Sequence, residues 1–173
     1  MKSNRLSYRT LDYSDAARIT ELAGDWDVAR MTARIPYPYS LTQAHHWIGS
    51  LEDGEFVRVV ELDGKLIGAV GYNPNADGSL EIGYWIGRPW WGNGYGTEAA
   101  EALMNYCFTE LGVARLTCCH FVDNVASARI IKKLGFRLMG PGEAWCEARQ
   151  AEAETLRYQR KRPLIARFRR VAA

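Results

Sequence analysis

The sequence predicts an α+β fold: a mixed sheet of about seven strands with helices on both faces, an α/β/α arrangement. Two patterns lead to this prediction. Three strand-like runs joined by tight turns precede residue 87 and predict an antiparallel meander. A glycine-rich loop at residues 92–96 then opens into a helical pattern that returns to another strand, a βαβ crossover. From a length of 173 residues and 47% hydrophobic composition we expect one domain over residues 1–162 and a basic tail over residues 163–173.

The N-terminal part of the chain predicts a strand at residues 5–9 and helices at residues 16–23, 26–31 and 41–51. Ser14 or Asp15 has a side chain that can cap the first of these helices, and Gly24 follows its last apolar residue. The stretch at residues 35–39 contains two prolines, each of which restricts the residue before it. We therefore expect that stretch to be extended.

The middle of the chain predicts the three strands of the meander. Residues 56–62 and 66–72 are rich in β-branched and apolar residues, and Asp63-Gly64 between them is the strongest short hairpin signal. A second turn at residues 75–78 leads into a strand at residues 80–86. The three strands together feed directly into the glycine-rich loop.

After that loop the sequence predicts helices at residues 98–111 and 124–134, and strands at residues 116–122, from residue 136, at 145–149 and at 155–160. Gly112 and Gly135 follow the last apolar residues of the two helices, where glycine adopts the left-handed conformation of a helix end. Asp123 or Asn124 can cap the second helix. The last two strands are expected to form a hairpin.

Composition limits the classes of protein to consider. No apolar run is long enough to span a membrane, and the N-terminus lacks the features of a secretory signal. Four cysteines without Cys-x-x-Cys spacing predict buried thiols in a reducing, cytoplasmic environment; they are Cys107, Cys118, Cys119 and Cys146. His45 and His46 are adjacent on a predicted helix and cannot bind one metal from a single face, so no metal site is expected.

The net charge of +2 is unevenly distributed. Between Arg157 and Arg170 the chain carries seven basic residues and no acid, so residues 1–156 are acidic overall. We expect this basic run to be a solvated terminus. Because Tyr158 and Phe168 are its two aromatic residues, the run lacks the aromatics that stack on bases, and no nucleic-acid surface is expected.

Gly92, Gly94 and Gly96 stand at alternate positions between the strand at 80–86 and the following helix. Glycine lacks a Cβ, so the backbone can turn tightly and bring its N–H groups against a ligand. The first turn of a helix also leaves N–H donors without partners and carries the positive end of the helix dipole. The segment from Trp91 to Thr97 is therefore predicted to bind a phosphorylated cofactor through its backbone.

Three kinds of phosphate-binding loop have glycine patterns that can be compared with this segment. A P-loop is excluded because no lysine follows the glycines. Residues 94–99 formally satisfy Gly-x-Gly-x-x-Ala of a dinucleotide fold, which leaves an oxidoreductase with Asp123 as the ribose-binding acid as an alternative. That fold places its loop after the first strand, whereas here a meander precedes it. The third kind is the Arg/Gln-x-x-Gly-x-Gly/Ala loop of an acyltransferase family, which residues 91–96 match in their last glycines.

Four segments in order and spacing resemble the Gcn5-related N-acetyltransferases (GNAT): residues 82–86, 91–99, 124–127 and 133–136. They are most similar to the branch that includes the bacterial ribosomal-protein N-terminal acetyltransferases, and the resemblance extends over residues 5–162. It implies a sheet splayed between its fourth and fifth strands and acetyl-CoA as cosubstrate. Trp91 stands where the wider family has arginine or glutamine, a change that matters little if backbone amides bind the phosphates.

The resemblance also implies where the cofactor would lie. The loop would cradle the diphosphate, the strand at residues 82–86 would pair with the pantetheine arm through its peptide groups, and the helix after residue 124 would reach the thiol end. The implied cofactor-binding residues are Trp85, Ile86, Trp91, Gly92, Asn93, Gly94, Tyr95, Gly96, Thr97, Asn124 and Ser127.

The expected reaction is direct attack of a neutral primary amine on the thioester in a ternary complex. A lysine amine is neutral about once in 2,500 molecules at pH 7 and an α-amine about once in ten. A protein N-terminal α-amine therefore needs little general-base help. Small amines, namely aminoglycosides, polyamines or amino acids, remain alternative acceptors, as does a cofactor-sensing module without turnover. The protein is expected to act as a monomer or homodimer.

Three residues are candidates for the chemistry. Glu81 is predicted to be the general base, and Glu147, expected on a late strand, is a weaker alternative. Ser127 is expected to donate to the leaving sulfur or to bind the cofactor. Many members of the wider family have a tyrosine acid at the position that is Ile131 here, so that mechanism is in doubt for this chain.

Overall fold

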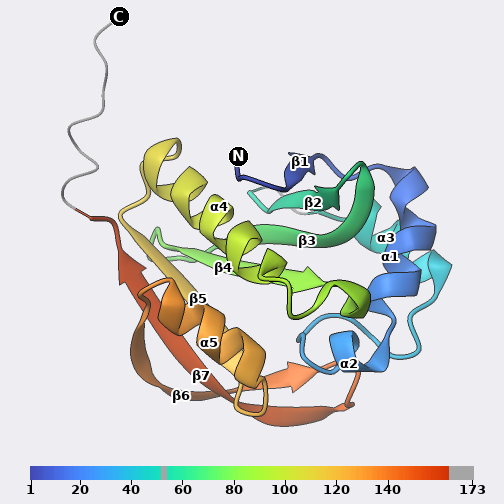
Figure 1. The fold of residues 1–173 in the computed structure, drawn as a ribbon. Coiled ribbons are helices and arrows are strands. Elements are labelled where there is room, and N and C mark those ends of the chain that lie inside the picture. The colour runs from blue at the N-terminus through green and yellow to red at the C-terminus, as the bar shows by residue number, and fades with distance from the viewer. Residues whose placement is uncertain (52–53, 164–173) are drawn as a thin grey trace, which may run out of the picture.

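The computed structural model describes residues 1–51 and 54–163. These residues form a seven-stranded mixed sheet in the order β1-β2-β3-β4-β5-β7-β6 (Figure 1). The strands are β1 (Ser7–Arg9), β2 (Phe56–Leu62), β3 (Lys65–Pro74), β4 (Leu80–Ile86), β5 (Arg115–Phe121), β6 (Arg137–Cys146) and β7 (Ala151–Lys161). The helices are α1 (Ala16–Ala23), α2 (Trp26–Ala29), α3 (Leu41–Gly49), α4 (Tyr95–Thr109) and α5 (Val125–Lys133), with short 3₁₀ turns η1 (Tyr13–Asp15) and η2 (Arg88–Trp90). The predicted α+β fold is confirmed.

Strands β2 to β4 form the predicted three-stranded antiparallel meander, and β1 adds to its edge by pairing antiparallel with β2. The turn between β2 and β3 holds Asp63 at φ 50° and Gly64 at φ 72°, the left-handed pair that a two-residue hairpin needs to match the strand twist. Aspartate and glycine tolerate this region better than other residues, so the hairpin prediction from Asp63-Gly64 is confirmed.

The sheet opens between β4 and β5. These two strands run parallel but pair only at Leu80 with Leu116 and at Glu81 with Thr117. Beyond Glu81 the strands separate, while β5 continues to pair with β7 along its whole length. The predicted splay between the fourth and fifth strands is confirmed, and it leaves one edge of β4 without a partner strand.

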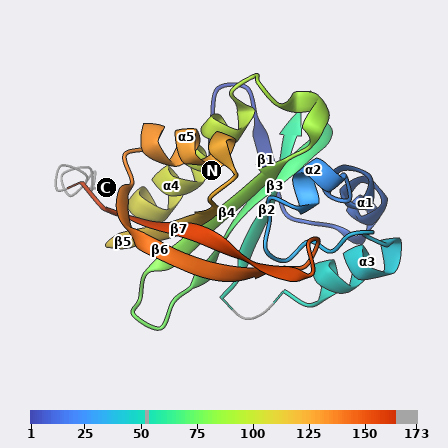
Figure 2. The same cartoon turned by 90° about the horizontal axis from the view of Figure 1, so that it is seen from below.

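Helices cover both faces of the sheet (Figures 1 and 2). On one face α4 and α5 pack over the central strands in the main core, which includes Leu103, Ile131 and Leu116, all 2% exposed or less. On the other face α1 and α3 pack over β2 and β3 in a second core, which includes Ile19 and Val59. The apolar spacing of both helix sets produces this division, because each helix buries one stripe.

The end of the sheet differs from the sequence prediction. A strand at residues 145–149 is wrong: β6 runs from Arg137 to Cys146, and residues 147–150 form the turn to β7. Strand β6 contains Pro141 between two glycines. Because β6 is the edge of the sheet, Pro141 pairs with Leu156 without leaving an inner ladder bond unmade.

Two helix starts also differ from prediction. Asp15 is the N-cap residue of α1, one of the two predicted, but its side chain makes no capping hydrogen bond to that helix. The side-chain cap lies one turn earlier: Asp12 accepts from the Ser14 amide at 2.9 Å, and Asp15 accepts from the Asp12 amide at 2.9 Å. This reciprocal pair begins a 3₁₀ turn ahead of α1. Helix α4 begins at Tyr95 rather than near residue 98, so the last glycine of the loop is already helical.

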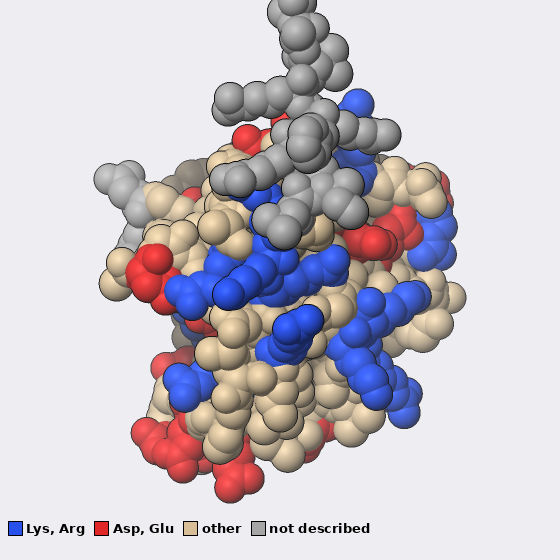
Figure 3. Space-filling view, turned by 90° about the vertical axis from the view of Figure 1, so that its left-hand side faces the viewer, with Lys and Arg blue, Asp and Glu red and all other residues tan. Residues whose placement is uncertain are grey.

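Part of the basic run lies within the sheet. Arg157, Arg160 and Lys161 belong to β7, and Arg162 donates to the Gly112 carbonyl at 2.8 Å. Figure 3 shows lysine and arginine side chains gathered on the side of the molecule that carries α5, β6 and β7. Residues 164–173 of the predicted tail lie outside the described residues. Within the described part of the chain, no helix has the length and apolar character needed to cross a membrane.

Candidate active site

A continuous cleft of about 1450 Å³ runs along the splay and across the face of the sheet. At one end it is lined by the glycine loop, the gap-facing edge of β4 and the start of α5, which we call the glycine-loop half. At the other end it is lined by the loop after α2, by α3 and by the ends of β2 and β3, which we call the α2–α3 half. Both halves meet where β4 and β5 separate.

The glycine loop presents unpaired amides. Gly92 and Gly94 have φ of 79° and 81°, conformations that other residues rarely adopt, so glycine is required at both. Within residues 1–51 and 54–163, the amide N–H groups from Gly92 to Thr97 have no hydrogen-bond acceptor. These donors, together with the N-terminal end of the α4 dipole, form a site suited to an anion.

Side-chain hydrogen bonds hold the loop in place. The Trp91 indole donates to the Ile86 carbonyl at 2.6 Å, and the Asn93 side-chain amide donates to the Trp91 carbonyl at 3.0 Å. From the N-terminus, Arg5 donates to the Asn93 carbonyl at 3.1 Å and pairs with Glu98 at 2.7 Å. Burial acts to raise the pKa of Glu98, but hydrogen bonds from Arg5 outweigh it and hold that pKa below its usual value.

Gly96 allows close packing of α4. A Cβ at this position would lie 3.1 Å from the Ile130 side chain of α5 and 3.8 Å from that of Ile86. The three glycines therefore have two structural roles: Gly92 and Gly94 permit the backbone turn, and Gly96 permits the approach of α4 to α5 and β4.

The free edge of β4 is defined by its pairing with β3. The Gly87 amide donates to the Ile67 carbonyl at 2.8 Å, and in an antiparallel ladder the bonded pairs alternate. The peptide groups of Trp85 therefore face β3, whereas those of Tyr84 and Ile86 face the gap. Of the two strand residues predicted to meet the cofactor, Ile86 presents its amide to the gap, and Trp85 packs its side chain against the second core. Tyr84 is not among the predicted residues.

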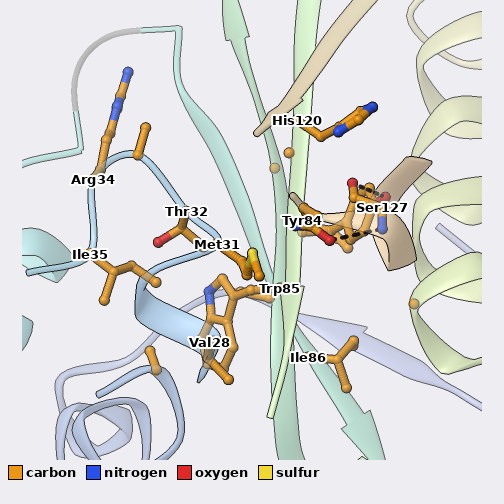
Figure 4. A pocket seen from close by; sticks show the side chains of 18 of the residues that line it. Val28, Met31, Thr32, Arg34, Ile35, Tyr84, Trp85, Ile86, His120 and Ser127 are labelled. Carbon is orange, nitrogen blue, oxygen red and sulfur yellow. Dashed lines mark hydrogen bonds between the residues drawn. The ribbon is translucent and has the colours of Figure 1, made fainter. Parts of the chain in front are cut away.

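Tyr84 and Ser127 meet across the gap. Their hydroxyl oxygens lie 2.8 Å apart, and the Asn124 side-chain oxygen accepts from the Ser127 amide at 3.0 Å as the cap of α5 (Figure 4). Burial raises the pKa of Tyr84 well above its ordinary value, so this phenol stays protonated at neutral pH. It can therefore donate to Ser127, which leaves the serine proton free to point into the cleft.

Glu81 lies where the two halves meet. It is the last β4 residue paired with β5 and lines the cleft, and the Cys119 thiol donates to its Oε1 at 3.3 Å. Cys119 is exposed to solvent through the cleft, so the prediction that all four cysteines are buried is wrong for this one. Protein atoms that crowd the thiol, and then the Glu81 charge, raise the pKa of Cys119 to about 12.

Glu147 lies elsewhere. It is in the turn between β6 and β7 rather than on a strand, and its carboxylate accepts from the Gln150 side chain at 3.1 Å. Its amide donates to the Ala33 carbonyl at 2.9 Å, which ties this turn to the loop after α2. Glu147 is not among the residues that line the cleft, so the structure separates it from Glu81 and Ser127.

His120 also lines the cleft but was not a predicted site residue. Its Nδ1 lies 2.8 Å from the Phe121 carbonyl, which only accepts, so Nδ1 carries the proton and Nε2 accepts from the Tyr158 hydroxyl at 3.2 Å. Both ring nitrogens are satisfied by protein groups. Among the described residues, no group of three or more histidine, cysteine or acidic side chains is arranged to hold a metal ion.

The α2–α3 half contains a polar trio that sequence patterns did not indicate: Arg34, Glu55 and Asn73. Arg34 pairs with Glu55 at 2.8 Å. With its amide oriented to suit both neighbours, Asn73 donates to Glu55 at 2.7 Å and accepts from Arg34 at 3.2 Å. Arg34 lies in the loop after α2, Glu55 lies immediately before β2 and Asn73 lies on β3, so no local motif links them.

Comparisons with known proteins agree with this architecture. The family model of the acetyltransferase (GNAT) domain matches residues 5–137. The uncharacterized N-acetyltransferase p20 of Bacillus licheniformis is 28% identical over 147 residues, 80% of this chain and 82% of that protein. The L-amino acid N-acetyltransferase AaaT of Escherichia coli is 24% identical over 143 residues, 79% of this chain and 86% of that protein.

Solved structures share the fold. A GNAT-family acetyltransferase from Bacillus anthracis superposes with a TM-score of 0.82 at 22% identity, covering 94% of this chain and 98% of that one. RimL, a ribosomal α-N-protein acetyltransferase solved with coenzyme A, superposes with a TM-score of 0.81 at 18% identity, covering 92% and 95%. The chain belongs to the GNAT family of acetyltransferases and is an N-acetyltransferase.

Proposed function

We propose that this protein transfers the acetyl group of acetyl-CoA to a primary α-amine, with both substrates bound in the cleft at once. The observation that carries the proposal is the row of unpaired amides from Gly92 to Thr97 at the mouth of the splay. These amides fit the diphosphate of the coenzyme, and each charge-assisted hydrogen bond contributes about 1.5–3 kcal/mol. That RimL binds coenzyme A on the same fold supports this assignment.

From the diphosphate the pantetheine arm would run along the free edge of β4. Amide groups of the arm can pair with the Tyr84 carbonyl and the Ile86 amide, which both face the gap, whereas the Ile86 carbonyl already accepts from the Trp91 indole. This path ends between Glu81 on the sheet and Ser127 on α5, where the thioester would lie. The Tyr84 amide then faces the thioester carbonyl and can stabilise the oxyanion that forms there.

The transfer requires one bond to form, one to break and one proton to move. The amine nitrogen attacks the thioester carbon, and collapse of the tetrahedral intermediate breaks the carbon–sulfur bond. Glu81 accepts the proton that the amine loses. The departing sulfur accepts a hydrogen bond from Ser127, whose own oxygen accepts from Tyr84, and the proton reaches the sulfur through solvent in the cleft. A thiol is a good leaving group, so no strong acid is required.

An α-amine is the acceptor class that the site favours. Near pH 7 about one peptide α-amine in ten is neutral, against about one lysine amine in 2,500, so an α-amine needs less help from a general base such as the half-buried Glu81. The names of two relatives support an α-amine: RimL acts on a protein α-amino group, and AaaT is an L-amino acid N-acetyltransferase.

Cosubstrate binding is tested by thermal unfolding. A ligand that binds only the native state raises the melting temperature, so acetyl-CoA at millimolar concentration should raise it while NAD and ATP should not. Thiol release from acetyl-CoA in the presence of α-amines then tests turnover. No shift with acetyl-CoA, or a larger shift with NAD, would contradict the proposal.

A matched pair of glycine variants tests the location of the site. Gly94 and Gly78 have nearly the same left-handed φ, 81° and 76°, so alanine should strain both backbones by a similar amount, about 1–2 kcal/mol. Gly78 lies in the β3–β4 turn, outside the cleft lining. Gly94→Ala should abolish the acetyl-CoA shift and Gly78→Ala should retain it. Equal shifts in the two variants would exclude the loop as the diphosphate site.

A further inference from the structure

A row of polar side chains crosses the floor of the α2–α3 half. In the register of the strands, Asn73 of β3 lies opposite Glu81 of β4. Glu55 immediately precedes β2, whose first pair joins Phe56 to Tyr72, so the same register sets Glu55 opposite Asn73. The row begins at the gap where the thioester would lie and leads away from it across neighbouring strands.

Arg34 stands over the far end of this row. Its guanidinium is fixed by Glu55 at 2.8 Å and by the Asn73 oxygen at 3.2 Å. The Glu55 side chain is 12% exposed, whereas that of Arg34 is 70% exposed. A guanidinium has five N–H donors, so several of them still face the cleft and solvent after these two contacts. The two contacts orient the planar guanidinium and leave its other N–H donors available to a ligand.

We infer that this guanidinium binds a carboxylate on the acceptor, and that the acceptor is a free α-amino acid. The inference rests on the proposed acetyl transfer at Glu81. Directly opposed side chains in an antiparallel pair lie about 5 Å apart, and Arg34 contacts Asn73, the cross-strand neighbour of Glu81. When the acceptor amine is held at Glu81, a carboxylate on the carbon that bears this amine is therefore within reach of the Arg34 guanidinium.

Charge distinguishes this acceptor from the other small amines. A polyamine or aminoglycoside would bring a second cation to the place that Arg34 occupies. Glu55, the acid that such a cation needs, already pairs with Arg34. A protein N-terminus would offer an uncharged carbonyl there and lose the charge-assisted bond that a carboxylate forms. A free carboxylate is the group that matches the remaining donors.

Apolar side chains provide the rest of the acceptor surface. Val28, Met31, Ile35 and Trp85 lie on the same side of β4 as Arg34, opposite Tyr84 and Ser127 (Figure 4). The loop that carries Met31 and Ile35 is held to the β6–β7 turn, where Arg149 donates to the Arg30 carbonyl at 2.8 Å. The inferred acceptor is therefore an α-amino acid with an apolar side chain.

The test compares acceptors that differ only at the carboxylate. Thiol release from acetyl-CoA is measured with L-leucine, L-methionine and L-phenylalanine, with their amides, and with the amines that lack the carboxyl group. The amides have the more readily neutral amine, so intrinsic reactivity favours them. We expect kcat/KM to be at least tenfold higher for the acids, against that trend.

Variants locate the carboxylate site. Arg34→Gln should lower kcat/KM for the amino acids about 10- to 100-fold, through KM, and leave the amides within about twofold. Arg34→Lys keeps the positive charge but not the planar guanidinium. Its kcat/KM for the amino acids should therefore lie between those of wild type and Arg34→Gln. Arg115→Gln is the control: Arg115 is also partly exposed and paired with an acid, Asp77, but lies outside the cleft lining. It should leave kcat/KM unchanged for both the amino acids and their amides. Melting temperatures confirm that each variant is folded.

The outcomes separate the inference from the proposed function. Turnover of amides, simple amines or N-terminal peptides at rates equal to or above those of the acids overturns the carboxylate site and leaves acetyl transfer standing. Equal losses for acids and amides in Arg34→Gln also overturn it, because the residue would then act on folding or on catalysis in general. Thiol release with none of these amines removes the proposed function and the inference together.

Discussion

The two halves of the cleft are built by different means. The glycine-loop half uses backbone: its donors are the amides of residues 92–97 and the gap-facing edge of β4, which follow one another in the chain. The α2–α3 half uses side chains, and Arg34, Glu55 and Asn73 come from three segments. A site made of backbone donors depends little on side-chain identity, provided that glycine permits the turn, whereas the α2–α3 half depends on three particular side chains.

Glu81 joins the two halves, and its replacement should have the largest effect. Glu81→Gln keeps the shape and removes the base, so kcat should fall about 10²–10⁴-fold, the usual contribution of a positioned general base. Acetyl-CoA should still raise the melting temperature, because the diphosphate contacts are intact. Glu147→Gln is the matched control, since that carboxylate lies in the β6–β7 turn away from the cleft lining. Steady-state thiol release measures both.

Two results would contradict this assignment. Unchanged kcat in Glu81→Gln would mean that solvent alone accepts the amine proton. A loss in Glu147→Gln as large as that in Glu81→Gln would mean that the β6–β7 turn acts on catalysis through the loop that it holds at Ala33.

The backbone geometry of the glycine-loop half could be anticipated from sequence patterns because its requirements are local. Left-handed φ at Gly92 and Gly94, and the cap that Asn124 provides to α5, depend on residues a few positions apart. The Asp63-Gly64 hairpin is local in the same sense. Such features are legible in a single sequence because one residue type satisfies each of them.

The features that sequence patterns missed or predicted wrongly depend on tertiary contacts. Arg34, Glu55 and Asn73 meet only after the strands are in register, and nothing in the neighbourhood of any one of them indicates the others. Cys119 was expected to be buried, but the splay exposes that face of β5. The strand predicted at residues 145–149 is wrong because the β6–β7 pairing places the turn at residues 147–150, and single-sequence propensity does not define such strand boundaries.

An ion pair between Asp15 and Arg9 supports the helices on the α2–α3 side of the sheet. Asp15, whose side chain is 7% exposed, accepts two hydrogen bonds of 2.7 Å from Arg9 and ties the start of α1 to β1. Asp15→Asn should cost about 1.5–3 kcal/mol of unfolding free energy, the usual loss for hydrogen bonds to a charged group. Since α1 packs in the second core, KM for the acceptor should rise while the affinity for acetyl-CoA stays within about twofold.

The stability that the Asp15–Arg9 pair contributes should depend on pH. The Arg9 guanidinium holds the pKa of Asp15 below its ordinary value. A depressed pKa contributes stability that is complete above the unfolded value, near 3.9, and is lost as pH falls through the folded value. The difference in urea midpoint between wild type and Asp15→Asn should be constant from about pH 6 to 8 and shrink below about pH 4. A difference that persists at low pH would show that the ion pair is not its source.

The smallest expected effect concerns how the backbone site is held. Trp91→Phe removes the 2.6 Å hydrogen bond from the indole to the Ile86 carbonyl, which ties the glycine loop to the end of β4, but removes no donor to the diphosphate. A neutral hydrogen bond contributes about 0.5–1.5 kcal/mol, so the Kd of acetyl-CoA should rise no more than about tenfold, with acceptor KM unchanged. Trp145→Phe is the control, because that residue is 47% exposed against 46% for Trp91 and lies on β6. Calorimetric titration measures the binding. A loss of acetyl-CoA affinity of a hundredfold or more would mean that the Trp91 ring itself contacts the coenzyme. The glycine-loop half would then bind through a side chain as well, and the two halves would not differ in the way described.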